Sequence, residues 1–323
     1  MTREIMKFLM FVALVLAAPV FLHGGYMMNV LVFVGIFTML AVALNLLLGL
    51  AGQISLGQAA FFGLGAYISA VLSTSYVINP WLSTAVAATV VGVSAFALGF
   101  PILKLKGHSL AMATLGLGVI VYIGFNETVN LTGGPSGLPG IPNLSLGRIV
   151  FDSDAKNYCL VWFFALLTVL LSVNLNASRI GRALRAIHDS EVAARIMGVN
   201  AGLLKVQIFT LSAVISSIAG SLYAHTVTFI SPASFGFNVS VELVTMVVVG
   251  GLGSIYGSVL GAVILTILPE FLRAFQDYDI IVYGAILILM IIFLPGGFVK
   301  GVGGLMDMIM AKVPGKAGDH AEG

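Results

Sequence analysis

Charged residues are scarce in this sequence. Asp, Glu, Lys and Arg make up 9% of its 323 residues, whereas soluble proteins carry roughly 25%. Hydrophobic residues account for 59%, and no charged residue occurs between Phe8 and Leu103. Because a helix rises about 1.5 Å per residue and the hydrocarbon core of a bilayer is about 30 Å thick, that stretch is long enough for about four crossings. The composition excludes a soluble enzyme, a disordered chain and a nucleic-acid-binding module, and it predicts an all-α integral membrane protein.

The sequence also lacks the residues that catalysis and metal binding need. Its single cysteine, Cys159, cannot form an internal disulfide and is predicted to be a small apolar packing residue. It contains no G-x-x-x-x-G-K-[ST] nucleotide-binding loop, no His-Glu-x-x-His and no paired-cysteine motif. We therefore expect no catalytic residue, no metal, no cofactor and no ATP binding by this chain itself.

Apolar runs predict the membrane segments. Eight runs are each long enough for one span, whereas residues 241–268 exceed the length of one span and are interrupted by Gly250, Gly251 and Gly253. That stretch is either one broken span or two short limbs. The eight single runs are residues 8–22, 27–48, 59–76, 81–103, 109–125, 158–175, 206–224 and 280–294.

The first run follows Arg3 and Lys7 and has the length of a secretion signal's hydrophobic region. Pro19 after Ala17 and Ala18 makes a poor cleavage site. We therefore expect this run to be retained as a membrane span.

The positions of Lys and Arg predict the topology. With two limbs in 241–268 there are about ten transmembrane or re-entrant segments, both termini are cytoplasmic, and 12 of the 15 Lys and Arg residues lie on that side. If 241–268 is one span, 10 of the 15 Lys and Arg residues lie on the cytoplasmic side. The expected organisation is a single transmembrane domain over 1–323, with an extracytoplasmic loop at 126–157, a cytoplasmic coupling loop at 176–205 and a cytoplasmic tail at 295–323.

The loop at 126–157 contains TGGPSGLPGIP, residues 132–142. Four glycines and three prolines in this stretch argue against regular structure but favour a rigid, shaped surface. Loops of this length are usually functional.

The loop at 176–205 holds a third of all Lys and Arg, and its sequence predicts two short helices. Ser178 and Ser190 are candidate N-caps, Glu191 and Arg195 are spaced for an i,i+4 ion pair, and Gly198 is a stop signal. The alternative is an ordinary positive loop lying on lipid headgroups. We favour a docking element, with small residues on an exposed apolar side that admit a partner. Its predicted coupling residues are Gly181, Arg182, Arg185, Ala186, Asp189, Glu191, Ala193, Ala194 and Gly198.

Four segments together resemble a known family. They are ALNLLLGLAGQISLGQAAFFGLGAYISAVL at 43–72, NLTGGPSGLPGIP at 130–142, GRALRAIHDSEVAARIMGVN at 181–200 and VVGGLGSIYGSVLGAVI at 248–264. In this order they resemble the LivM kind of permease from ATP-binding-cassette importers of branched-chain amino acids. The resemblance implies a multi-pass subunit of the bacterial inner membrane. Its expected partners are a sister permease, two cytosolic ATP-binding subunits, a periplasmic substrate-binding protein and the lipid bilayer.

The general coupling motif of such importers is only partly present. Ala193, Ala194 and Gly198 have its spacing, but Glu191 lies one position too early. The coupling role of 181–200 therefore follows from the resemblance and from the chemistry of the loop.

Polar residues in the apolar segments are candidates for a translocation pathway. Asn45, Gln53, Ser55 and Gln58 lie among glycines that should break or distort a helix, and broken helices at membrane depth often line a cavity. The alternative is that they hydrogen-bond between helices. Glu242 is a carboxylate inside a membrane segment, and it either faces the pathway or lies at the interface.

Three function classes follow from these features. A translocation subunit driven by partner ATPases is favoured, because the chain has a docking loop and no nucleotide-binding motif. A secondary carrier would need more intramembrane ionisable groups, and an intramembrane enzyme would need a catalytic constellation. Branched-chain amino acids are the favoured substrates, with other amino acids, urea or short amides as alternatives, and both homodimeric and heterodimeric pairing stay open.

Overall fold

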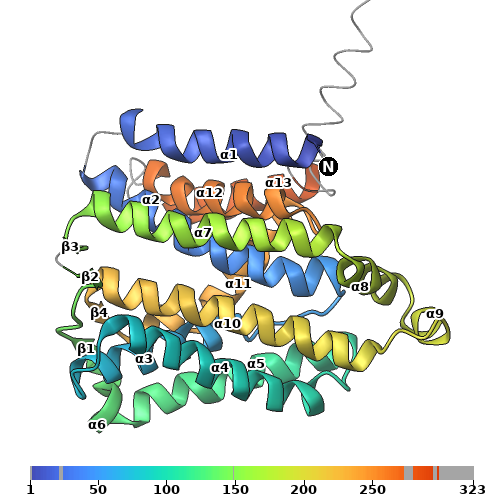
Figure 1. Ribbon diagram of the computed structural model, residues 1–323, viewed down its shortest axis with the longest axis horizontal. Coiled ribbons are helices and arrows are strands. Elements are labelled where there is room, and N and C mark those ends of the chain that lie inside the picture. Colours follow the sequence, from blue (N-terminus) through green and yellow to red (C-terminus); the bar gives the residue numbers. More distant parts are fainter. Residues whose placement is uncertain (1, 22–24, 148, 273–278, 294–296, 298–323) are drawn as a thin grey trace, which may run out of the picture.

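The computed structural model describes residues 2–21, 25–147, 149–272, 279–293 and 297. Long helices lie side by side along one direction, α8 and α9 lie at one end of the bundle, and α6 and the short strands lie at the other (Figure 1). The predicted tail at 295–323 lies outside the described residues, apart from Gly297. The long helices are α1 (Thr2–Phe21), α2 (Gly25–Asn45), α3 (Gln58–Thr74), α4 (Pro80–Ile102), α5 (Gly107–Glu127), α7 (Asp154–Ala177), α10 (Ala201–Val227), α11 (Phe237–Gly250), α12 (Ile255–Leu272) and α13 (Asp279–Phe293).

The predicted all-α membrane fold is confirmed. Seven segments among the described residues are helical and apolar enough to cross a membrane, whereas the apolar part of α1 (Phe8–Pro19) and α3 are shorter. With α13, ten helices of the described chain correspond to the predicted spans. The seven are Gly25–Leu50, Pro80–Ile102, Gly107–Glu127, Asp154–Ala177, Ala201–Val227, Pro232–Gly250 and Ile255–Leu272.

The ambiguous stretch 241–268 forms two limbs. Helix α11 ends at Gly250 and α12 begins at Ile255. The two helices pack closely, and a Cβ added at Gly261 would overlap the carbonyl oxygen of Met246. The glycines therefore both end the first limb and let the second return against it.

The chain between α2 and α3 is irregular. A π-helix (Leu46–Leu50) follows α2, and residues 51–57 then run without helix to Gln58. Helix α3 has 17 residues and is therefore about 25 Å long, which is short of the hydrocarbon core. The extended segment runs alongside α5, where Leu56 N donates to Thr114 Oγ1 at 3.0 Å, and it supplies the missing length. The predicted break in this region is confirmed.

Helix α2 forms the centre of the bundle, because 83% of its membrane window is buried. The corresponding figure is 22% for both α4 and α5, which therefore lie at the edge of this subunit. Helices α3 and α10 approach each other through Gly65 and Gly220, where an added Cβ would overlap backbone atoms of Ser217 and Phe62, respectively. Small residues thus allow backbone contact, as is typical of membrane helices.

The segment 126–157 contains short regular elements, so the prediction of no regular structure was wrong in part. It comprises α6 (Val129–Thr132), a 3₁₀ turn η2 (Gly134–Ser136), and strands β1 (Leu138–Pro139), β2 (Ser145–Leu146) and β3 (Ile149–Val150). Strand β1 pairs with β4 (Phe229–Ile230), which precedes the 3₁₀ turn η3 (Pro232–Phe235), and β2 pairs with β3. The prolines and positive-φ glycines separate these elements but do not prevent them.

Candidate functional site: a docking loop and the broken helices behind it

The predicted loop consists of α8 (Arg179–Asp189) and α9 (Glu191–Ile196). Ser178 Oγ accepts from Gly181 N at 3.2 Å, and Ser190 Oγ accepts from Ala193 N at 3.3 Å, so both predicted caps are confirmed. Gly198 follows α9 with a φ of 84°, a left-handed conformation that favours glycine. The two helices project from one end of the bundle (Figure 1).

Several predicted coupling residues hold the loop to the bundle. Arg182 Nη1 donates to Ala177 O at 3.1 Å and Arg185 Nη1 donates to Asn176 O at 3.0 Å, so both cations satisfy carbonyls at the C-terminal end of α7. A Cβ at Gly181 would overlap the same turn of backbone. These three residues fix the orientation of α8.

Glu191 is the electrostatic centre of the loop. Its carboxylate lies 2.9 Å from Lys205 Nζ on α10, 3.2 Å from Lys106 Nζ between α4 and α5, and 2.5 Å from Arg195 Nη2. The pair with Arg195 confirms the predicted i,i+4 spacing. Partial burial alone would raise the pKa of Glu191, but the hydrogen bonds from Lys205 and Lys106 outweigh it and lower the pKa from 4.5 to about 2.

These ion pairs predict how the loop responds to acid. Because the pKa of Glu191 is lower in the folded loop, its stabilising contribution is complete above about pH 4.5 and is lost as the pH falls towards 2. We expect hydrogen-exchange protection of residues 191–199 to fall over that range in the wild type. Glu191→Gln should show the lower protection already at pH 7 and no acid dependence. Equal protection in the two proteins at pH 7 would contradict this role of Glu191.

The outer face of α9 is apolar. Val192, Ile196 and Met197 are 67%, 80% and 84% exposed. Ala193 is exposed beside them as predicted, but Ala194 is buried with Ile187 and other apolar side chains of the loop. The prediction that Ala194 is exposed was wrong, because the side of α9 that carries it packs onto this subunit. Ala186 and Asp189 on α8 are exposed.

His188 connects the loop to the break after α2. Its Nδ1 lies 3.1 Å from the carbonyl oxygen of Gly49, which belongs to the π-helix. A Cβ at Gly49 would in turn overlap Gly253 N in the turn between α11 and α12. The loop, the π-helix and the α11–α12 turn are therefore in direct contact.

Two of the predicted pathway residues are engaged inside the subunit. Asn45 Nδ2 donates to Ser254 O at 2.9 Å, and its Oδ1 accepts from Gly253 N at 3.0 Å. Gln58 Nε2 donates to Ser212 Oγ at 2.9 Å and Ser216 Oγ at 2.5 Å. Both side chains form interhelical hydrogen bonds, as in the alternative interpretation, while Gln58 Oε1 has no partner among the described residues. Their assignment to the pathway stays a prediction.

The other three pathway candidates are Gln53, Ser55 and Glu242. Gln53 is 3% exposed, and neither polar atom of its amide has a hydrogen-bond partner among the described residues. It lines a polar cavity of about 230 Å³ beneath the loop, together with His188 and Glu191. Ser55 is also buried, and Glu242 is half-buried in the second turn of α11, towards the end of the bundle that carries α6. The assignment of Gln53, Ser55 and Glu242 to the pathway also stays a prediction.

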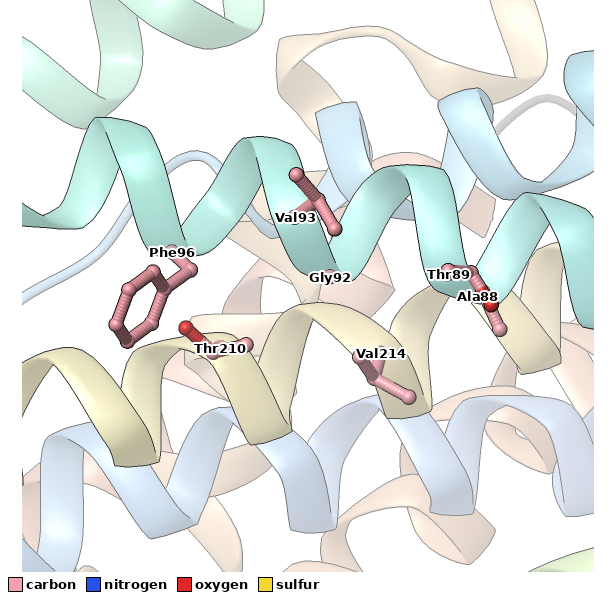
Figure 2. Close-up of a pocket in the computed structure, with 7 residues that line it drawn as sticks. All are labelled: Ala88, Thr89, Gly92, Val93, Phe96, Thr210 and Val214. Atoms are coloured by element: carbon pink, nitrogen blue, oxygen red, sulfur yellow. The ribbon is translucent and has the colours of Figure 1, made fainter.

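A shallow groove on the outside of the bundle differs from this polar cavity, because both hydroxyls in its lining have hydrogen-bond partners (Figure 2). It lies between α4 and α10, has a volume of about 460 Å³, and is lined by mostly small or apolar side chains. Its two hydroxyls bond to their own helices, Thr89 Oγ1 to Ala85 O and Thr210 Oγ1 to Val206 O, respectively. This is how a surface facing hydrocarbon satisfies its polar groups.

Comparison with known proteins matches this arrangement to a family. The profile described as "Branched-chain amino acid transport system / permease component" matches residues 26–291. The chain belongs to this family of permease components. The permease is 33% identical to the high-affinity branched-chain amino acid transport system permease protein LivM of Escherichia coli K12, over 81% of this chain and 67% of LivM. It is 32% identical to LivM of Salmonella typhimurium, over 90% of this chain and 74% of the relative.

More distant relatives include a second type of branched-chain amino acid permease and a sugar permease. The permease is 25% identical to LivH of Salmonella typhimurium, over 81% of this chain and 90% of LivH. It is 28% identical to the galactose/methyl galactoside import permease MglC of Escherichia coli, over 86% of this chain and 90% of MglC. No solved structure matches the permease.

Sequence reasoning missed part of the site. Val192, Ile196 and Met197 were not singled out, although apolar residues four apart in a charged loop are a detectable signal. Lys106 and Lys205 were counted only for topology, because their shared partner Glu191 is distant in sequence. The contact of His188 with Gly49 was not predicted, because the two residues lie 139 positions apart in the sequence.

Proposed function

We propose that this permease is the membrane-spanning subunit of an ATP-binding-cassette importer for leucine, isoleucine and valine. It would lie in the bacterial inner membrane with α8 and α9 on the cytoplasmic side and both termini inside. Its partners would be two cytosolic ATP-binding subunits, a sister permease in a heterodimer and a periplasmic substrate-binding protein. Hydrolysis of ATP would take place in the partner subunits.

The docking loop is the observation that carries this proposal. Its outer face exposes three apolar side chains, Val192, Ile196 and Met197, which suits a protein partner better than lipid headgroups. Its inner side is anchored by Glu191 to Lys106 and Lys205. Movement of a partner bound to α9 would therefore be transmitted to α10 and to the segment between α4 and α5.

The contacts behind the loop suggest how closure of the ATPases is passed on. His188 meets the π-helix at Gly49, and Gly49 meets the turn between α11 and α12. A shift of α8 would displace both broken segments together. ATP binding to the partner subunits favours one permease conformation only to the extent that the ATP-bound partners bind that conformation more tightly than the other.

Reconstitution tests this function. We expect proteoliposomes that hold the permease with its co-purified subunits to take up leucine only when the binding protein is outside and ATP is inside. Isoleucine and valine should compete, and galactose should not. Mass spectrometry of the complex purified in mild detergent should find an ATPase with a nucleotide-binding loop and a second permease. Recovery of the chain alone, with uptake driven by an ion gradient, would instead indicate a secondary carrier.

A further inference from the structure

A cationic pocket lies where α4, α9 and α10 meet, at the end of the bundle that carries the docking loop. Its volume is about 400 Å³, and it shares residues with the polar cavity beneath the loop. Among its lining residues Glu191 is the only carboxylate. The cationic side chains of the lining are Lys104, Lys106, Arg195 and Lys205. The lining therefore carries an excess of positive charge.

Glu191 does not saturate these cations. Lys106 and Lys205 share one oxygen of its carboxylate, and Arg195 contacts the other. A lysine ammonium has three donors and a guanidinium has five, so most of their donors stay available. Lys104 is exposed and forms no ion pair with another described residue. An anion that enters the pocket would meet four cationic groups with donors to spare.

The apolar side of the cationic pocket continues into the groove of Figure 2. Phe100 lines the pocket, and Phe96, one turn away on α4, lines the groove. Their rings meet edge to face, with centroids 5.1 Å apart. On α10, Val206 and Thr210 are related in the same way. The pocket and the groove therefore form one seam between α4 and α10, cationic at one end and apolar along the rest.

The dimensions and position of this seam fit a lipid. The helix rises about 18 Å from Phe100 to Ala88, and one leaflet of hydrocarbon is about 15 Å thick. Only 22% of the membrane window of α4 is buried, so the seam lies at the edge of the subunit. Both hydroxyls of the groove are bonded to their own helices and need no polar ligand. An acyl chain suits the groove, and an anionic headgroup suits the pocket.

We propose that the seam binds an anionic phospholipid of the cytoplasmic leaflet, with its phosphate in the cationic pocket and one acyl chain along the groove. Basic pockets between membrane helices on the cytoplasmic side are suited to acidic headgroups. The lipid would bridge the α4–α5 segment to α9 and α10, and it would thereby steady the base of the docking loop. The inference takes only the orientation in the membrane from the proposed function and does not depend on the transported substrate.

Lys104→Gln tests the headgroup pocket without breaking an ion pair of the described chain. The permease is purified with the subunits that remain bound, and native mass spectrometry follows titration with phosphatidylglycerol or phosphatidylcholine of identical chains. We expect the wild type to bind phosphatidylglycerol at least about tenfold more tightly than phosphatidylcholine, and Lys104→Gln to weaken phosphatidylglycerol binding about fivefold. Arg179→Gln is the control, because Arg179 is exposed at the start of α8 and does not line the seam. It loses the same charge and should bind as the wild type does.

Val93→Trp tests the groove. Val93 is 66% exposed and lines the groove, so a larger side chain occupies the groove without entering the core. Val90→Trp is the matched control, since Val90 is 48% exposed on the same helix and does not line the groove. We expect phosphatidylglycerol affinity to fall at least about tenfold for Val93→Trp and to stay within about twofold for Val90→Trp. Val93→Phe covers the case in which tryptophan prevents assembly.

Several results would overturn the site. Equal affinity for the two lipids would remove the headgroup preference, and equal losses in Lys104→Gln and Arg179→Gln would indicate general attraction to this end of the bundle. Displacement of the lipid by an equal concentration of inorganic phosphate would indicate a pocket for free anions. Unchanged binding in Val93→Trp would separate the groove from the pocket.

Two further results would assign the seam to a protein partner instead. Loss of a second permease from the Val93→Trp complex would indicate a subunit interface. Phosphatidylglycerol binding only after removal of an ATPase would place the four cations in the ATPase contact. Failure of the wild type to take up leucine with ATP would instead remove the proposed function and leave the lipid site standing.

Discussion

Ile196→Asp should separate the permease from its ATPase while leaving the permease folded. Ile196 is 80% exposed at the end of α9, so a carboxylate there meets water in the isolated subunit. In the proposed complex the same carboxylate would be buried without a partner. Losses of this kind at the centre of an interface are commonly about 2 kcal/mol or more, which is about a 30-fold weaker association. Co-purification of the ATPase from membranes measures this effect.

Leu146→Asp is the matched control for that variant. Leu146 is 61% exposed in β2, at the opposite end of the bundle, and it undergoes the same change of chemistry. It should retain the ATPase in full. If Ile196→Asp also retained it, the outer face of α9 would not be the docking surface.

Gly65→Val should prevent stable folding. A Cβ at this position would overlap the backbone of Ser217, and neither α3 nor α10 can withdraw because Gly220 meets Phe62 in the same way. Ser221 Oγ also donates to Gly65 O at 3.1 Å, so the two helices are tied at this point. Overpacking alone costs about 1–3 kcal/mol, and separating two helix backbones costs more. We expect little monodisperse protein by size-exclusion chromatography in mild detergent.

Gly116→Val provides the comparison, because an added Cβ on that part of α5 meets open space. Its elution profile and melting temperature should match those of the wild type. A normal melting temperature for Gly65→Val would mean that the α3–α10 contact is looser than the structure indicates.

Local chemistry made the docking loop predictable from the sequence. Ser178, Ser190 and Gly198 act on backbone groups within three or four residues of themselves, so their roles can be read from short segments. The helix break near Gly49 and the two limbs around Gly251 were likewise visible as glycines in apolar runs. The long apolar runs set the number of helices by length alone.

Contacts between distant segments could not be predicted in the same way. Asn45 was correctly singled out as unusual, but its partner Gly253 lies 208 residues further along the chain. Ala194 was placed on the wrong side of α9, because which side packs onto the bundle depends on Ile187 and on the exit of the chain into α10. The groove between α4 and α10 had no sequence signal, since aliphatic residues in a membrane helix look alike whether they face lipid or protein.

The hydrogen bonds of Asn45 have a consequence for biosynthesis. Asn45 supplies both a donor and an acceptor to the turn between α11 and α12, and its Oδ1 is the partner of Gly253 N in an apolar setting. Helix α2 leaves the ribosome long before that turn does, so the amide is already in the membrane when the hairpin arrives. A chain rearranged to begin at α11 would have to insert the hairpin without that partner, and the natural order of synthesis avoids this difficulty.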